Sequence, residues 1–175
     1  MIDSCVNSIT DYGGSVIGFD QHEGPLKIHL RAARAFLGVP KNGTVCAILS
    51  EIYWLTPKYR TRLRMVRQYH RMLRMSDDRL TKIMLKWDKR INNAGIVNTW
   101  YSEVKQVLFD CSFQNIYETN CLFPLKPTID TMQSTLKSKQ NSELKTECSV
   151  MPKLRTFNLF KDFNEQPSFL SKPLN

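Results

Sequence analysis

The sequence lacks the cysteine and histidine spacings that a metal site or a disulfide framework would need. Its five cysteines are widely scattered, their number is odd, and no Cys-x-x-Cys pair occurs. None of the three histidines stands at ligand spacing from a cysteine. We therefore predict neither a zinc site nor a disulfide scaffold, and we expect no metal and no cofactor.

Long hydrophobic runs are also missing. No apolar run approaches the ~18 residues that a membrane span requires. The first residues, Met-Ile-Asp-Ser-Cys, lack the charged and apolar regions of a signal peptide. We therefore expect no membrane partner and a location inside the cell, in the cytoplasm or the nucleus. The sequence leaves the oligomeric state open.

The sequence also lacks a recognisable set of catalytic residues. His29 and His70 have no serine, cysteine or aspartate partner at a spacing that suggests a triad, so we interpret both as surface or edge histidines. The run Ser76-Asp77-Asp78 is similar to the aspartate pair of polymerases, but that pair stands on a β-hairpin turn and these flanks are helical. An N-cap with two acids at the positive end of a helix dipole explains the run. We predict no catalytic residue and expect the chain not to be an enzyme.

The sequence does contain a series of helix signals. Apolar residues recur at spacings of three and four, with turn residues such as Gly38 and Asn42-Gly43 between the segments. No run shows the period-two alternation of a half-buried strand. We predict an all-α fold, an irregular array of about seven or eight amphipathic helices with a poorly ordered C-terminal part.

The composition changes at Pro124 and Pro127. Beyond them the helical pattern fades into the polar stretch 137–142, in which Lys, Ser, Gln and Asn dominate. We therefore predict a helical domain over residues 1–122 and a partly helical linker and tail over residues 123–175.

The most complete helix signal runs from Thr56 to Met75. Thr56 suits an N-cap, and Pro57 suits the first helical position because its missing N–H would be unpaired there. At ~100° per residue, five arginines fall within an arc of roughly 80°. They are Arg60, Arg64, Arg67, Arg71 and Arg74. The neighbouring arc is apolar, so the pattern is typical of a helix that packs on a core and shows positive charge beside it.

The positive charge is concentrated around this helix. Residues 57–90 hold twelve basic and three acidic residues, a net charge of +9, and the whole chain also carries +9. The remainder of the chain is therefore neutral. Such a concentration indicates a polyanionic partner, although a solvated helix face is an alternative interpretation.

These patterns predict a sequence-independent interface for the backbone of RNA or DNA, formed by the five arginines. A smaller basic stripe on a preceding helix extends it and consists of Lys27, Arg31 and Arg34. Tyr59 and Tyr69 are expected to stack on unpaired bases. Two alternatives stay open: arginines that pair with acids elsewhere in the fold, and a target helix of the calmodulin-binding type.

The order of several short motifs resembles a known family. The motifs are Asp11-Tyr12-Gly13, Arg34-Ala35-Phe36-Leu37-Gly38-Val39, Ala47 to Glu51 with Trp54, Thr56-Pro57 to Arg60, Arg71 to Met75, Asp78-Arg79-Leu80, Trp100-Tyr101, and Pro152 to Lys161. In this series the chain is similar to the region that follows the polymerase core in non-LTR (LINE-type) retrotransposon polyproteins. Ile17 departs from the pattern, because such proteins often have a tryptophan there.

The resemblance implies a fragment. It would correspond to the thumb-like helices and linker of a reverse transcriptase polyprotein, which help to grip template RNA and nascent DNA. The endonuclease and the metal-binding aspartates of the polymerase are not in this sequence, so no catalytic residue carries over. The alternatives are a helical module that binds an acidic protein, and a decayed fragment with no independent function.

Overall fold

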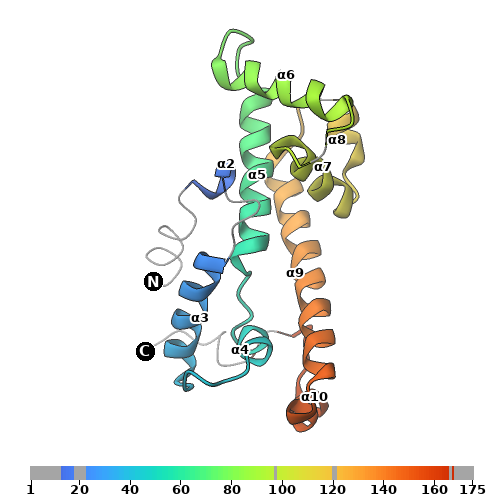
Figure 1. Cartoon of the computed structure of the whole chain (residues 1–175). Coiled ribbons are helices and arrows are strands. Elements are labelled where there is room, and N and C mark those ends of the chain that lie inside the picture. The colour runs from blue at the N-terminus through green and yellow to red at the C-terminus, as the bar shows by residue number, and fades with distance from the viewer. Residues whose placement is uncertain (1–12, 18–22, 97, 120–121, 166, 168–175) are drawn as a thin grey trace. The chain divides into compact units, whose positions relative to one another are not determined.

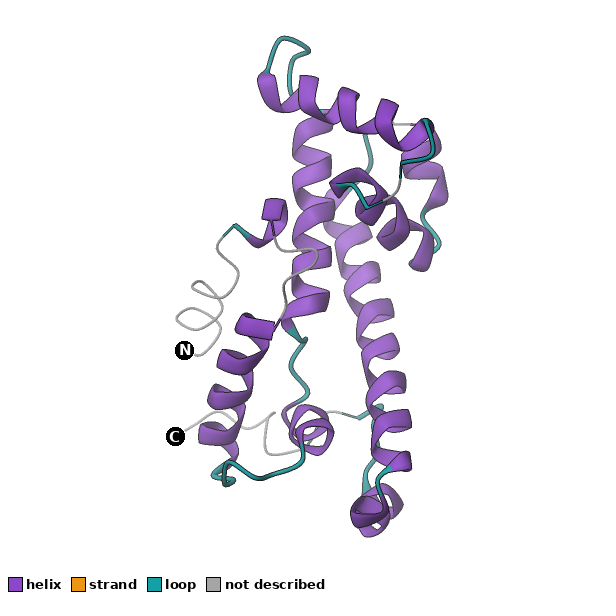
Figure 2. Cartoon of the chain, viewed as in Figure 1, coloured by secondary structure: helices purple, strands orange, loops and turns teal. Residues whose placement is uncertain are grey.

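A computed structural model of the protein describes residues 13–17, 23–96, 98–119, 122–165 and 167 (Figure 1). In these residues the regular secondary structure is entirely helical, and no strand occurs in them (Figure 2). The predicted all-α fold is confirmed.

The described part contains nine α-helices and one 3₁₀ helix. In chain order they are α2 (Gly14–Ile17), α3 (Glu23–Leu37), α4 (Val45–Ile52), α5 (Pro57–Leu73), α6 (Leu80–Asn93), α7 (Trp100–Asp110), α8 (Gln114–Thr119), α9 (Leu125–Val150), η1 (Pro152–Leu154) and α10 (Arg155–Phe160). A search of the described residues finds no helix with the length and apolarity that a membrane crossing needs.

Several helices begin and end at the residues that the sequence indicates. α5 begins at Pro57, directly after Thr56, and α4 begins directly after Thr44. Gly38 follows α3 with φ at 65°, a left-handed conformation that glycine adopts without the strain of a Cβ. At α7 a full capping box forms, because Thr99 and Ser102 each accept the other's backbone N–H, at 3.2 and 2.9 Å.

Contacts along the chain divide it into two compact units. The first unit comprises Met1–Thr10, His22–Tyr59 and Leu136–Asn175, and the second comprises Asp11–Gln21 and Arg60–Thr135. The boundaries therefore fall inside α5 and α9. The boundary predicted between residues 122 and 123 is not the boundary of these units, and its status as a domain limit stays a prediction.

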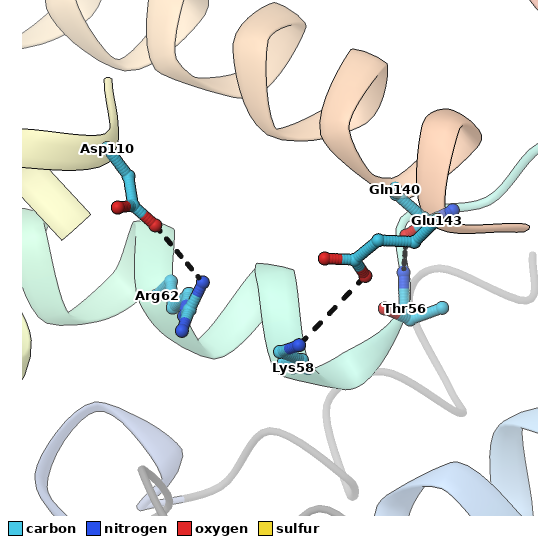
Figure 3. Close-up of polar contacts among 6 residues, drawn as sticks. All are labelled: Thr56, Lys58, Arg62, Asp110, Gln140 and Glu143. Atoms are coloured by element: carbon cyan, nitrogen blue, oxygen red, sulfur yellow. Dashed lines mark hydrogen bonds and ion pairs between the residues drawn. The ribbon is translucent and has the colours of Figure 1, made fainter. Parts of the chain in front are cut away.

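The core of the first unit joins α3, α4 and the C-terminal part of α9. Its buried members are Leu30, Ala33, Cys46, Ile48, Leu49, Ile52, Leu144, Cys148 and Phe163. Gln140 is buried beside it, and its amide binds the backbone between α4 and α5. Its Oε1 accepts the Thr56 N–H at 2.8 Å (Figure 3), and its Nε2 donates to the Trp54 carbonyl at 2.9 Å.

The buried residues of the second unit come from α5, α6, α7, α8 and α9. α5 contributes the largest share, with Leu63, Met65, Val66, Tyr69 and Met72 all buried. α7 packs against both α6 and α8. α6 crosses the C-terminal end of α5 (Figure 1), where the Lys82 ammonium donates to the Leu73 carbonyl at 2.8 Å.

The expected fading of the helical pattern after Pro127 is wrong. α9 runs unbroken for 26 residues, through the whole polar stretch. Buried positions continue at helical spacing along it, at Met132, Leu136, Gln140, Leu144 and Cys148. Because Gln140 is one of these buried positions, the polar composition of the stretch does not reveal the buried face, whereas the helical spacing of the positions does.

The expected cap at the start of α6 is also wrong. Ser76, Asp77 and Asp78 form a turn before the helix, and the N-cap residue is Arg79, whose side chain makes no cap hydrogen bond. A hydrogen bond from Ser76 lowers the pKa of the exposed Asp78 carboxyl. Asp77 pairs with Lys86 at 3.0 Å.

Three cysteines in the described residues are buried and unpaired in disulfides, Cys46 and Cys148 in the first unit and Cys111 in the second. Burial raises the pKa of the Cys148 thiol to about 12, and the neighbouring Cys46 adds to the shift. A thiol of this kind stays protonated and unreactive at neutral pH.

Candidate nucleic-acid interface

The five arginines predicted to share one helical face differ in exposure. Arg67, Arg71 and Arg74 are exposed, whereas Arg60 and Arg64 are half-buried. The Nε atom of Arg60 is fully buried. Only the C-terminal half of the predicted arginine face is therefore available to a partner.

We call Arg67, Arg71 and Arg74 the arginine row. Arg67 and Arg71 lie about 40° apart around α5, and Arg74 directly follows its last residue, Leu73. No ion pair or side-chain hydrogen bond of the three is present among the described residues. Three unpaired guanidinium groups on one face create a local positive potential that attracts anions.

The other basic residues at the start of α5 are engaged within their own units. In the second unit, Arg62 pairs with Asp110 of α7 at 3.8 Å, with both side chains mostly buried (Figure 3). In the first unit, Lys58 pairs with Glu143 of α9 at 4.0 Å, at the surface. Neither residue is one of the five arginines of the predicted face, so the alternative that half of those arginines pair with acids elsewhere in the fold stays open.

The basic residues of α6 serve different purposes. Lys82 donates to a carbonyl of α5, as described above, and Lys89 lies over the rings of Tyr69 and Tyr101, 5.3 Å from each centroid. Burial lowers the pKa of Lys89, and the nearby Lys82 lowers it further. Arg79 and Arg90 are exposed, and the described residues supply no ion pair to either.

The stacking role expected of Tyr59 and Tyr69 does not carry over to this structure. Their exposed fractions are 1% and 0%, so neither ring offers a face to a base. Tyr69 instead packs against Tyr101 at 6.0 Å between ring centroids. Burial, with Tyr101 beside it, raises the pKa of Tyr69 well above its usual value of 10. Both rings are core residues here.

The smaller basic stripe lies on α3, in the first unit. Lys27 is exposed and sits 3.7 Å from Glu23, one helical turn earlier, while Arg31 is exposed. Arg34 is half-buried, and its Nε is buried without a hydrogen-bond partner among the described residues. The stripe belongs to the first unit and the arginine row to the second.

Both histidines are buried, which corrects the expectation of surface or edge positions. His29 packs edge-on against Trp54, with 5.7 Å between ring centroids. The His70 Nε2 lies 3.1 Å from the Phe123 carbonyl oxygen, and its ring packs edge-on against the Phe123 ring. Neither arrangement resembles a catalytic site. Among the described residues, no group of three His, Cys, Asp or Glu side chains is placed to hold a metal ion.

Arg79 and Arg90 are two further exposed basic residues, which the sequence reasoning counted as charge but did not assign to the interface. Their exposure follows from the orientation of α6, which hydrophobic periodicity does not determine.

A comparison of the chain with family models, curated proteins and solved structures finds no match.

Proposed function

We propose that this chain binds the backbone of RNA or DNA without sequence preference, through the arginine row of α5. The observation that supports the proposal is the exposure of Arg67, Arg71 and Arg74 along the C-terminal end of α5, where none of them forms an ion pair with the described residues. Arginine is well suited to contact backbone phosphates, because its planar guanidinium matches the geometry of a phosphate and stays charged. The proposed activity is binding alone, with no chemical step.

We further propose that the chain is a non-catalytic segment related to the thumb and linker region of LINE-type reverse transcriptase polyproteins. The support is the motif order in the sequence. The genomic DNA upstream of the Met1 codon tests this relation directly. An in-frame or decayed polymerase sequence there supports it, and unrelated flanking DNA contradicts it.

The binding proposal is tested by the salt dependence of affinity. Three phosphate contacts predict that the logarithm of the binding constant falls with the logarithm of salt concentration at a slope of about −2 to −3. Fluorescence anisotropy with a labelled RNA–DNA hybrid measures this slope on the full chain. Replacing Arg67, Arg71 and Arg74 together with alanine should bring the slope near zero and weaken binding at low salt.

The matched control replaces three exposed basic residues of the first unit, Lys41, Lys145 and Arg155, with alanine. It changes the net charge equally, so a loss confined to the arginine-row variant separates a local interface from general charge attraction. A cooperative thermal melt by circular dichroism must accompany each measurement, since a decayed fragment would lose helix without cooperativity. Equal losses in the two triple variants would contradict the proposed interface.

A further inference from the structure

One face of α6 exposes a stripe of large apolar side chains. Leu80, Met84 and Trp87 are 71%, 61% and 62% exposed, and Ile83 and Ile91 are also exposed. At ~100° per residue these five positions fall within an arc of about 100°. The residues that line the shallow groove of about 550 Å³ along this stripe all belong to α6, so no other described element covers it.

The opposite side of α6 holds the helix in the second unit. Leu85 is its one buried residue, and the Asp88 carboxylate accepts the Tyr101 N–H of α7 at 2.8 Å. These contacts fix which face points outward. Helical periodicity groups these apolar residues on one face, and the structure places that face in solvent. Single exposed apolar residues are common on protein surfaces, whereas a contiguous apolar stripe of this kind typically marks an interaction site.

Positive charge follows one edge of the stripe. Lys86 and Arg90 lie about 40° apart around the helix, beside the apolar arc, and Arg79 immediately precedes the first helical residue. All three are exposed. Lys86 also contacts Asp77 at 3.0 Å, but both side chains are well exposed, and pairs of this kind are weak. The basic edge therefore remains available to acidic side chains of a partner.

A recess adjoins the other side of the stripe. It measures about 310 Å³ and is lined by residues of α2, α5, α6 and α7, among them Met72, Met84 and Trp100. The Trp100 indole N–H donates to the Ser15 carbonyl at 2.7 Å and fixes one wall. A single apolar side chain from a docked peptide can fill such a recess, whereas the flat surface of a bilayer leaves it empty.

We propose that this face of α6 docks an amphipathic, acidic helix of another protein. The partner's apolar residues would lie on the stripe, one of them would enter the recess, and its acids would face Arg79, Lys86 and Arg90. This is the helix-in-groove mode of recognition, with charge along one edge setting the register. A second copy of this chain fits poorly, because it would bring the same basic edge to the contact.

The test uses the full chain and a labelled synthetic peptide of about 18 residues. The peptide carries leucines at spacings of three and four with glutamates along one edge, and the comparison peptide has lysines in place of the glutamates. Fluorescence anisotropy should show at least ~10-fold tighter binding of the acidic peptide. Trp87→Ala should weaken its binding at least ~10-fold, as loss of a central aromatic anchor does.

Two control variants test whether the peptide binds at this face of α6. Leu159→Ala removes an exposed apolar residue of the first unit and should leave peptide binding unchanged. The triple arginine-row variant should also bind the peptide normally, so this result is independent of the nucleic-acid proposal. Replacing Lys86 and Arg90 together with alanine should weaken binding of the acidic peptide several-fold and leave binding of the lysine peptide unchanged. Since Trp87 and Arg90 are exposed, none of these changes should alter the circular dichroism spectrum.

Four outcomes overturn the proposal. They are no binding of the acidic peptide at about 1 mM, equal affinity for the two peptides, Trp87-dependent binding to vesicles of phosphatidylcholine and phosphatidylserine without peptide binding, and Trp87-dependent self-association. The third would assign the face to a membrane surface, and the fourth to a second copy of the chain.

Discussion

α5 and α6 follow one another in the chain, and each has a basic and an apolar face. In α5 the apolar residues, such as Leu63 and Val66, are buried in the second unit, and the exposed surface is arginine. In α6 a single residue, Leu85, is buried, and bulky apolar side chains remain in solvent. The comparison shows that periodicity identifies residues sharing a face, whereas the surrounding elements decide which face is covered.

The largest expected difference between the two helices concerns stability. Leu63→Ala in α5 should lower the free energy of unfolding by about 2–5 kcal/mol, because it removes buried methyl groups and leaves a cavity. The same change at the exposed Leu80 of α6 should cost no more than about 0.5 kcal/mol. Urea unfolding followed by circular dichroism measures both. Similar costs at the two positions would mean that the α6 stripe is covered in solution.

A smaller effect is expected at the start of α6. α7 has a capping box, whereas the N-cap residue of α6 is Arg79, whose side chain accepts no hydrogen bond from the first turn. Arg79→Ser supplies an acceptor at a position with extended backbone angles. It should therefore stabilise the second unit by about 0.5–1 kcal/mol. A lower urea midpoint for this variant would contradict the prediction and would show that the Arg79 side chain itself stabilises the fold.

The smallest effect concerns Lys89, on the side of α6 that meets α5. Its pKa is lowered from the usual 10.5, so the unfolded chain binds this proton more tightly than the folded chain. The folded state should therefore gain stability as pH rises toward 10.5. Lys89→Met should remove that gain, and the difference between the two proteins should widen from pH 8 to 10.

Lys86→Met, at an exposed position on the same helix, is the matched control for this titration. Tyr69 and Tyr101 have raised pKa values because of burial, so they oppose the trend above pH 10 by favouring the unfolded tyrosinate. The comparison is therefore made below that pH. A stability difference between wild type and Lys89→Met that does not vary with pH would contradict the prediction.

Local signals predicted several local features, although not the N-cap of α6. Thr56-Pro57 predicted the start of α5 and Gly38 the end of α3, because caps and turn conformations depend on a few neighbouring residues. The basic face of α5 follows in the same way from the helical repeat.

Long-range features were not accessible in this way. Arg60 is half-buried and Tyr69 is fully buried because of elements that pack around α5, and a helical wheel contains no information about them. Gln140 was read as part of a polar linker because only the fold reveals the Trp54 carbonyl and Thr56 N–H that satisfy its amide. The exposed stripe of α6 was missed for the same reason.

The positions of the buried cysteines provide a separate reporter for each unit. Cys46 and Cys148 lie in the first unit and Cys111 in the second, and alkylating reagents reach a buried thiol only when its surroundings open. Pulsed alkylation in rising denaturant, followed by peptide mass mapping, would therefore record the opening of each unit in one experiment. No engineered label is needed, because the native thiols already distinguish the two halves of the fold.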